Sequence, residues 1–360
     1  MTERNFIPEP YSKTVDSGVF QWSSPSNIAL VKYWGKKKNQ IPENPSISFT
    51  LDYCKTITKL SFSKKESHDN FSFDVFLDGE KKDSFKPKIS TFFERIEPYL
   101  PFLKQYYFKI ETENTFPHSS GIASSASGMS ALALCLMSVE NTLSDGVSEA
   151  FFTKKASFLA RLGSGSACRS IEGELVVWGT HNLVEGSSDL FGLKYPCQVH
   201  DNFKNYQDTI LLVDKGEKQV SSTVGHNLMH GHPFAEKRFE QAENNISEIK
   251  NILERGDLDA FIALVESEAL TLHAMMMTSM PYFILMKPNT LQIINKIWTF
   301  RENTGSKVCF TLDAGANVHV LYPEKEAAHV LKFIKNELVV YCQNGHYICD
   351  VVGLGAKNIL

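Results

Sequence analysis

A run of small polar residues leads directly into an apolar helix pattern in the stretch HSSGIASSASGMSALALCL, residues 118–136. The apolar residues recur at helical spacing: Met129, Leu132, Ala133, Leu136 and Met137. This spacing places them on one face of an α-helix, which predicts a core helix that begins within the serine run. The fold must therefore bury this helix and accommodate the serine- and glycine-rich segment at its N-terminus.

The start of this predicted helix is suited to an anion. The first backbone N–H groups of a helix lack intrahelical partners and the helix dipole is positive there, so phosphate is favoured. Gly121 and Gly128 would let a phosphate approach the backbone closely. Ser124, Ser125 and Ser127 offer hydroxyl donors or a Mg²⁺ ligand. The alternative is that small residues only allow tight packing, with one serine as the N-cap.

The serine run does not match the common nucleotide-binding or nucleophile motifs. It lacks the Gly-Lys-Ser/Thr ending of a Walker A loop and the GxGxxG pattern of dinucleotide-binding loops. No serine in it has the flanking glycines of a GxSxG nucleophile elbow.

The composition is that of a globular protein without a broad attraction for nucleic acid. The 360 residues carry a net charge of -4, with 42% hydrophobic and 22% charged residues. Mild acidity disfavours a nonspecific nucleic-acid surface, so we expect no nucleic-acid partner. Seven scattered cysteines without a CxxC pair indicate a reducing compartment. The polar N-terminal segment and the lack of an apolar run of bilayer length lead us to expect a cytoplasmic protein without a membrane span.

The order of predicted elements indicates an α+β protein of two domains, because the chain exceeds the roughly 250–300 residues at which single cores stop growing. We expect strands and a loop within 22–51, then strands at 57–63, 71–80, 106–114, 173–179, 208–214, 307–312, 318–322 and 347–352. We expect helices near 88–100, after 124, and at 148–162, 233–254, 257–276, 289–303 and 324–336, with a tight loop at 163–170. Residues 181–205 mix Gly, Ser, Asp, Pro and Asn, so we place the boundary there, with domains 1–195 and 196–360.

Two further segments bring cations close to hydroxyl groups. The segment KYWGK places Lys32 and Lys36 around Tyr33 directly after an apolar strand, which suits a multiply charged anion. The alternative is a solvated basic loop. The segment GSGSACRS (163–170) surrounds Arg169 with serines, and its guanidinium can bind a carboxylate or phosphate through two parallel hydrogen bonds. The alternative there is an ordinary turn with a surface arginine.

Asp313 lies where an apolar strand ends and a glycine-containing turn begins, in VCFTLDAGANVHVLY. Such an aspartate either bonds the turn backbone or stands at the mouth of a site, able to accept or orient a hydroxyl proton.

The segment VSSTVGHNLMHGHPF contains His226, His230 and His232 and raises the question of a metal site. We do not favour one, because the spacing is not HExxH and no carboxylate partner is evident.

Taken together, these segments resemble the diphosphomevalonate (mevalonate diphosphate) decarboxylases, within the superfamily of galactose, homoserine, mevalonate and phosphomevalonate kinases, the GHMP kinases. The matching segments follow the family's order: NIALVKYWGK (27–36), ENTFPHSSGIASSASG (113–128), GSGSACRS (163–170), KQVSST (218–223), LHA (272–274) and FTLDAGAN (310–317). They span the chain from about residue 22 to its end. KYWGK and SGSACRS are more specific than the serine run, which many of these kinases share.

The resemblance implies a two-domain, GHMP-kinase-like α+β fold with a ribosomal-protein-S5-like N-terminal half that binds ATP and a ferredoxin-like C-terminal half that carries the catalytic aspartate. It implies an enzyme that uses ATP and Mg²⁺ and is typically a homodimer. The implied reaction phosphorylates the 3-hydroxyl of mevalonate 5-diphosphate and then releases phosphate and CO₂ to give isopentenyl diphosphate and ADP.

The resemblance also implies roles for individual residues. Asp313 would accept or orient the 3-hydroxyl proton, and Lys32 would neutralise charge during transfer. Arg169 would hold the substrate carboxylate, with Asn27 nearby. The residues expected at the substrate diphosphate are Tyr33, Lys36, Ser164, Ser166 and Ser222. Those expected at the ATP phosphates are Gly121, Ser124, Ser125 and Ser127, with Ser124 or Ser125 near the ATP-bound Mg²⁺.

The sequence departs from the family's pattern at three places. It has Asn44-Pro45-Ser46 where Asn-Ser-Ser or Asn-Asn-Ser is common, Ala316 where proline is common, and 118–120 (HSS) where Thr-Ala-Ala is common. Pro45 removes an N–H and a hydroxyl near the expected substrate pocket. A decarboxylase acting on mevalonate 5-phosphate therefore stays an alternative, as does a kinase that phosphorylates and stops. A non-catalytic binding protein on the same fold is a more distant one.

Overall fold

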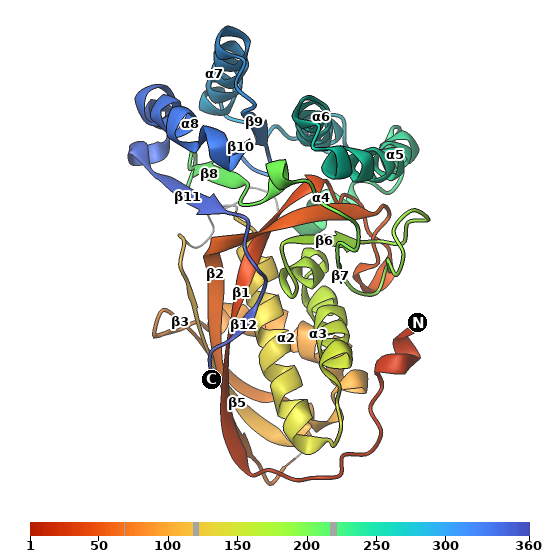
Figure 1. Cartoon of the computed structure of the whole chain (residues 1–360). Coiled ribbons are helices and arrows are strands. Elements are labelled where there is room, and N and C mark those ends of the chain that lie inside the picture. Colours follow the sequence, from red (N-terminus) through yellow and green to blue (C-terminus); the bar gives the residue numbers. More distant parts are fainter. Residues whose placement is uncertain (68, 118–121, 217–221) are drawn as a thin grey trace.

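The computed structural model describes residues 1–67, 69–117, 122–216 and 222–360. Two sheets, each accompanied by helices, divide the molecule as Figure 1 shows, which confirms the α+β expectation. The first sheet and helices α1–α3 form the lower half of that view, and the second sheet with α5–α8 forms the upper half.

Two long antiparallel strands, β1 (Ser17–Val31) and β2 (Ser46–Lys64), form the centre of the first sheet. The order is β12-β1-β2-β5-β3-β4, with β6 on β2 and β7 on β6, and only the β3–β5 pair is parallel among the described strands. The other strands are β3 (Ser72–Leu77), β4 (Glu80–Lys81), β5 (Tyr106–Asn114), β6 (Leu175–Trp178), β7 (Leu193–Lys194) and β12 (Lys357–Asn358).

The expectation of separate strands before and after residue 52 is wrong, because β2 runs through as one strand. The register with β1 jumps there: Pro25 pairs with Lys55, and Asn27 pairs with Thr50. The N–H groups of residues 52–54 donate instead to the two carboxylate oxygens of Asp350, at 2.7–2.9 Å. A side chain from the far end of the chain thus satisfies this bulge, as buried backbone groups require.

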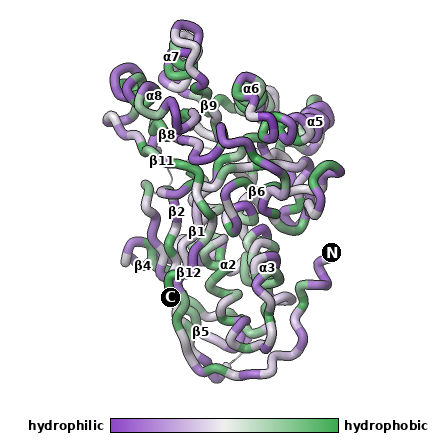
Figure 2. Tube along the Cα trace, in the orientation of Figure 1, coloured by the Kyte–Doolittle hydropathy of each residue, from purple (hydrophilic) through white to green (hydrophobic). Residues whose placement is uncertain are grey.

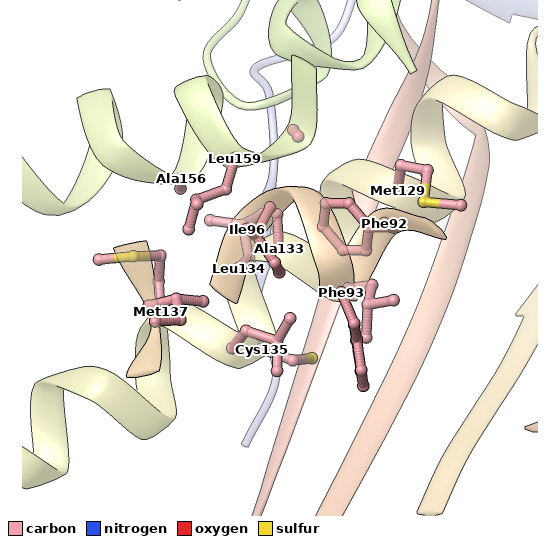
Figure 3. Packing of buried hydrophobic residues seen from close by; sticks show 14 of the residues in the cluster. Phe92, Phe93, Ile96, Met129, Ala133, Leu134, Cys135, Met137, Ala156 and Leu159 are labelled. Atoms are coloured by element: carbon pink, nitrogen blue, oxygen red, sulfur yellow. The ribbon is translucent and has the colours of Figure 1, made fainter. Parts of the chain in front are cut away.

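Three helices pack against the first sheet: α1 (Lys86–Ile96), α2 (Ser124–Leu143) and α3 (Glu149–Gly163). Figure 1 shows α2 and α3 side by side on it. Figure 3 shows the cluster they form, with Phe92, Phe93 and Ile96 from α1, Met129, Ala133, Leu134, Cys135 and Met137 from α2, and Ala156 and Leu159 from α3. The helical spacing of apolar residues therefore identified a true core face.

The second sheet has the order β11-β8-β10-β9, and all its pairs are antiparallel. Its strands are β8 (Gln207–Leu211), β9 (Cys309–Thr311), β10 (Val318–Tyr322) and β11 (Tyr347–Val351). The accompanying helices are α4 (Ser222–Asn227), α5 (Ala235–Arg255), α6 (Leu258–Met277), α7 (Pro288–Thr304) and α8 (Ala327–Phe333). Figure 2 shows α2 as largely hydrophobic and α5 as largely hydrophilic, in keeping with their interior and peripheral positions.

Short 3₁₀ helices fill many connections: η1 (Glu3–Phe6), η2 (Lys38–Gln40), η3 (Asp83–Phe85), η4 (Glu97–Tyr99), η5 (Pro101–Lys104), η6 (Gly165–Ser170), η7 (Asp201–Phe203), η8 (Glu324–Glu326), η10 (Val339–Tyr341) and η11 (Gln343–Gly345). A π-helical turn, η9 (Ile334–Leu338), follows α8. Among the described helices, α6 alone is long and apolar enough to cross a bilayer, and 61% of its apolar window is buried inside the molecule.

The C-terminal segment returns to the first sheet, where β12 pairs with β1 (Figure 1). The fit is close: a Cβ added at Gly173 would lie 2.4 Å from the backbone nitrogen of Gly355, so no larger residue fits there. The proposed division into 1–195 and 196–360 stays a prediction, and the last residues of the second segment pack with the first.

Candidate active site

A cavity of about 570 Å³ opens where the two halves meet. It is lined mainly by the first half, and by His226, Leu272, Asp313 and Ala314 from the second. Its hydroxyl-bearing and charged lining residues include Lys32, Tyr33, Lys36, Lys88, Ser124, Ser125, Ser164, Ser166, Arg169 and Asp313. Segments that are distant in the sequence therefore converge on one space, as a substrate cleft requires.

Lys32 and Asp313 form an ion pair at this cavity. Lys32 directly follows β1, Asp313 lies just beyond β9, and the distance from Lys32 Nζ to Asp313 Oδ1 is 3.2 Å. The lysine side chain is 2% exposed and the aspartate side chain 34%. Burial lowers the pKa of Lys32, and the Asp313 carboxylate opposes that shift. The pair can supply a proton acceptor and a desolvated cation at the same point.

The backbone at Asp313 is held by His273 of α6, whose Nε2 donates to the Asp313 carbonyl oxygen at 3.1 Å. Burial lowers the pKa of His273 to about 4, so the imidazole is neutral at pH 7. Five residues earlier on α6, the fully buried carboxylate of Glu268 pairs with Arg238 of α5 at 2.6 Å. The sequence interpretation assigned no role to these three residues. A signal was present, since charged residues and a histidine interrupt an otherwise apolar helix.

Arg169 lies in the 3₁₀ helix η6, and the alternative of an ordinary turn with a surface arginine is wrong, because the residue is only 3% exposed. Its Nε donates to Asn27 Oδ1 at 3.3 Å and its Nη1 donates to Ser46 Oγ. Asn27 does not line the cavity in the described part of the chain; its Nδ2 donates to Ser170 Oγ at 2.8 Å. Burial lowers the pKa of Arg169, which nevertheless stays charged at neutral pH. Arg169 is thus a fixed cation in the cavity wall.

The serine run begins α2 at the cavity. The N-cap is Ala123, with a left-handed φ of 45° and no capping side chain, so the alternative of a serine N-cap is wrong. Ser124 and Ser125 occupy the first two helical positions and line the cavity. Lys88 Nζ donates to Ser125 Oγ at 2.6 Å. A helix N-terminus with two hydroxyl groups and an ammonium fits a nucleotide's phosphates.

Ser127 does not line the cavity, although it was expected at the ATP phosphates. It is fully buried, and its Oγ lies 2.6 Å from Thr56 Oγ1 of β2, so it faces the sheet and not the cavity. The reason is helical geometry, since a residue two or three positions along the first turn points to a different side. Gly121 lies outside the described residues. The backbone of Ser222 opens α4, and its side chain is outside what the structure describes.

Tyr33, Lys36, Ser164 and Ser166 line the cavity together, as the resemblance implies for residues at a substrate diphosphate. The Tyr33 hydroxyl is buried and has no hydrogen-bond partner among the described residues. Burial raises the pKa of Tyr33 above its usual value, so the hydroxyl keeps its proton and can donate. Burial also lowers the pKa of Lys36. This end of the cavity therefore offers donors that an anion can accept.

Two of the three departures from the family pattern fall on described residues. Within the described residues, neither Pro45 nor Ala316 lines the cavity. Pro45 packs against Gly179, and the carbonyl of Ala316 accepts a hydrogen bond from Thr290 Oγ1 at 2.6 Å. Residues 118–120 lie outside the described residues.

Comparison with known families and proteins gives consistent matches over both halves. Residues 24–189 match the diphosphomevalonate decarboxylase-like N-terminal domain, and residues 209–351 match the mevalonate 5-diphosphate decarboxylase C-terminal domain. The diphosphomevalonate decarboxylase of Gibberella zeae is 30% identical, covering 87% of this chain and 83% of that protein. The one from Bos taurus is 28% identical, covering 87% and 79%.

Solved structures agree with these matches. The mevalonate diphosphate decarboxylase of Staphylococcus aureus superposes with a TM-score of 0.81 and 27% identity, covering 96% of this chain and 98% of that one. A structure of MDDEF in complex with MVAPP, AMPPCP and magnesium gives a TM-score of 0.81 and 26% identity, covering 95% and 99%. The GHMP-kinase-like two-domain fold expected from the sequence is thereby confirmed.

Proposed function

The chain belongs to the diphosphomevalonate decarboxylase family, and we propose that it converts mevalonate 5-diphosphate and ATP to isopentenyl diphosphate, ADP, phosphate and CO₂ in the cavity described above. The observation that carries this proposal is the Lys32–Asp313 pair, which shares one cavity with the fixed cation Arg169 and the N-terminus of α2. A base, a carboxylate-binding cation and a phosphate site are what the reaction needs.

In the first step, Asp313 accepts or orients the proton of the 3-hydroxyl as that oxygen attacks the γ-phosphorus of ATP. Lys32 lies beside it and stabilises the negative charge on the transferring group. The partial exposure of Asp313, at 34%, supports this role because a substrate hydroxyl can reach the carboxylate. Catalysis of this kind depends mainly on positioning and electrostatics.

In the second step, the C3–O bond breaks and phosphate leaves with the bonding electrons. The electrons of the bond between C2 and the carboxylate carbon form the C2–C3 double bond, and CO₂ is released. Arg169 holds the carboxylate through its planar guanidinium, with Asn27 and Ser46 fixing the orientation of that group. A tertiary hydroxide leaves poorly, which is why phosphorylation must come first.

ATP binds with its phosphates at the N-terminus of α2, where Ser124, Ser125 and Lys88 contact them. An added Cβ at Gly128 would meet no atom within 4 Å, which leaves room along the helix for a ligand. Mg²⁺ accompanies the nucleotide, near Ser124 or Ser125, and when bound neutralises phosphate charge. The gathering of hydroxyl groups and an ammonium here supports this assignment.

The 5-diphosphate is the preferred substrate over the 5-phosphate. Tyr33, Lys36, Ser164 and Ser166 form one wall and supply more donors than a single phosphoryl group needs. We propose that Ser222 also contacts the substrate diphosphate and that Gly121 contacts the ATP phosphates. Ser127 contacts neither, because its hydroxyl bonds Thr56 where α2 packs on the sheet.

The protein acts in the cytoplasm as a homodimer. The seven cysteines are all free thiols, which supports a reducing compartment. Met280, Tyr282 and Ile284 are 79%, 70% and 66% exposed within five residues of chain, and an apolar group of this kind supports association. Sedimentation velocity at micromolar concentration tests the dimer.

The test of function is a coupled assay of ADP and CO₂ release with mevalonate, its 5-phosphate and its 5-diphosphate. We expect both products in equal amounts and the highest kcat/KM with the 5-diphosphate. A phosphorylated product that accumulates without CO₂ would show a kinase instead. Faster turnover of the 5-phosphate would overturn the substrate assignment while leaving the reaction type intact.

A further inference from the structure

His226 occupies a fixed position in the wall of the cavity, and the reaction as described makes no use of it. It lies on α4 and is 7% exposed. The imidazole packs against two aromatic rings, with centroid distances of 4.2 Å to Tyr33 and 4.7 Å to Trp34. Its Nδ1 accepts the backbone N–H of Gly35 at 3.0 Å. Ring packing and the hydrogen bond together fix the orientation of the imidazole.

The hydrogen bond from Gly35 determines the protonation of the ring. Because Nδ1 accepts, it carries no proton, so the neutral ring must carry its proton on Nε2. Burial lowers the pKa of His226 to about 3, and the positive charges of Lys36 and Arg169 act in the same direction. His226 is therefore a neutral donor at physiological pH. Within the described residues, Nε2 has no hydrogen-bond acceptor.

The surroundings of His226 indicate that the hydrogen-bond acceptor for Nε2–H comes from a ligand. His226 lines the cavity with Tyr33 and Lys36, and the buried Tyr33 hydroxyl also lacks a partner among the described residues. The Tyr33 hydroxyl therefore carries a desolvation cost that an anion can remove, and His226 Nε2 is a second donor in the same cavity wall without a protein acceptor among the described residues. A metal ion does not fit, because His230 is exposed and both ring nitrogens of His232 contact the protein, at Phe234 N–H and the Met275 carbonyl.

We propose that His226 is a substrate-binding residue whose Nε2–H donates to a phosphoryl oxygen of the phosphorylated substrate, beside the hydroxyl of Tyr33. The assignment rests on the proposed function only for the identity of the substrate; the anion contact follows from the cavity itself. A neutral donor binds the phosphoryl oxygen without adding a third positive charge next to Lys36 and Arg169. The His226 contact thus increases the affinity for the substrate and takes no part in phosphoryl transfer or decarboxylation.

Two substitutions separate the two nitrogens of the ring. In His226→Asn, the shorter side chain keeps an acceptor near the position of Nδ1 for the Gly35 N–H but has no donor at the position of Nε2. In His226→Gln, the longer side chain places its amide donor near the position of Nε2. We expect His226→Asn to raise KM for mevalonate 5-diphosphate by about tenfold or more, because a hydrogen bond to a charged group is lost. His226→Gln should recover most of this, and kcat and KM for ATP should change less than about twofold in both. His230→Asn, at an exposed neighbour, is the matched control.

A second readout does not depend on turnover. Inorganic pyrophosphate is titrated into wild-type protein and His226→Asn by calorimetry, and the ¹⁵N signal of His226 Nε2 is followed by NMR. We expect weaker pyrophosphate binding by His226→Asn and a shift of the Nε2 signal in the wild type. Unchanged KM and pyrophosphate affinity in His226→Asn would overturn the proposal, as would an equal rise of KM for ATP. Pyrophosphate binding that depends on His226, in a protein without decarboxylase activity, would uphold the anion contact and reject the proposed function.

Discussion

The backbone N–H of Lys32 donates to the Glu268 carboxylate at 2.8 Å, although 236 residues separate the two in the sequence. Arg238 donates to the carbonyl of Lys32 at 3.0 Å and also to Glu268. The backbone N–H and carbonyl of Lys32 are thus both hydrogen-bonded to side chains of helices in the second half. His273, on the same helix as Glu268, holds the carbonyl of Asp313. The helix α6 therefore sets the position of both members of the Lys32–Asp313 pair.

Replacing Glu268 by Gln tests this arrangement. The charge of Arg238 would remain buried without its partner, so we expect a loss of about 3–5 kcal/mol in the free energy of unfolding. We also expect kcat to fall more than KM for either substrate rises, because Lys32 loses its fixed position. Denaturant unfolding and steady-state kinetics measure these effects. The exposed Glu248→Gln on α5 is the control, and equal behaviour of the two variants would refute the role of Glu268.

Asp313→Asn removes the carboxylate and keeps the shape of the side chain. We expect kcat to fall by about 10² to 10⁴ or more, with ADP and CO₂ release reduced equally because phosphorylation precedes decarboxylation. The free energy of unfolding should also fall, because the buried Lys32 ammonium loses its carboxylate partner, but by less than in Glu268→Gln, because Asp313 is partly exposed and its carbonyl contact with His273 is kept. Asp201→Asn, at a highly exposed aspartate, serves as the control. Full turnover by Asp313→Asn would exclude it as the base.

Arg169→Lys keeps the charge and removes the planar guanidinium. A lysine cannot donate to Asn27 and Ser46 and also bind a carboxylate through two parallel bonds. We expect KM for mevalonate 5-diphosphate to rise about ten- to a hundredfold, while KM for ATP changes much less. The exposed Arg255→Lys is the matched substitution. A parallel rise in both KM values would argue that Arg169 supports the whole cavity and not the carboxylate.

The sequence was sufficient wherever the determinant was local. Apolar spacing located α2, and its residues Met129 and Ala133 lie in the core as expected. Ser124, Ser125, Lys32, Arg169 and Asp313 were singled out by residue type and by motif, and they line one cavity. The orientation of Ser127 was not predicted. Serines within one helical turn point to different sides of the helix, and which of them is buried depends on where the sheet packs.

The interactions that were missed join distant segments. Residues 52–54 looked like a break between strands because the acceptor for their N–H groups, Asp350, lies about 300 residues away. Glu268 and Arg238 belong to no motif, and their pairing depends on how α5 and α6 pack. His226 was considered only as a metal ligand; its partner Gly35 N–H and the packing against Tyr33 and Trp34 exist only in the folded chain.

Buried neutral histidines predict a loss of stability in mild acid. Burial lowers the pKa of His226 to about 3 and of His273 to about 4, against an unfolded value of 6.5. Between pH 6.5 and about 4 the unfolded chain therefore binds protons that the folded chain does not, so stability falls as pH falls. Each histidine contributes about 1.4 kcal/mol per pH unit once the pH is well below 6.5. Asp208 acts in the opposite sense, because burial raises its pKa.

The contribution of one histidine is isolated by comparing slopes. His273→Gln keeps a donor for the Asp313 carbonyl but cannot take up a proton in this range. We therefore expect its free energy of unfolding to fall less steeply than that of the wild type between pH 6 and pH 5, by about 1 kcal/mol. The exposed His230→Gln is the control and should follow the wild-type pH dependence. Denaturant melts at pH 7, 6 and 5 provide the comparison, and equal slopes for His273→Gln and wild type would mean that His273 is protonated in the folded protein.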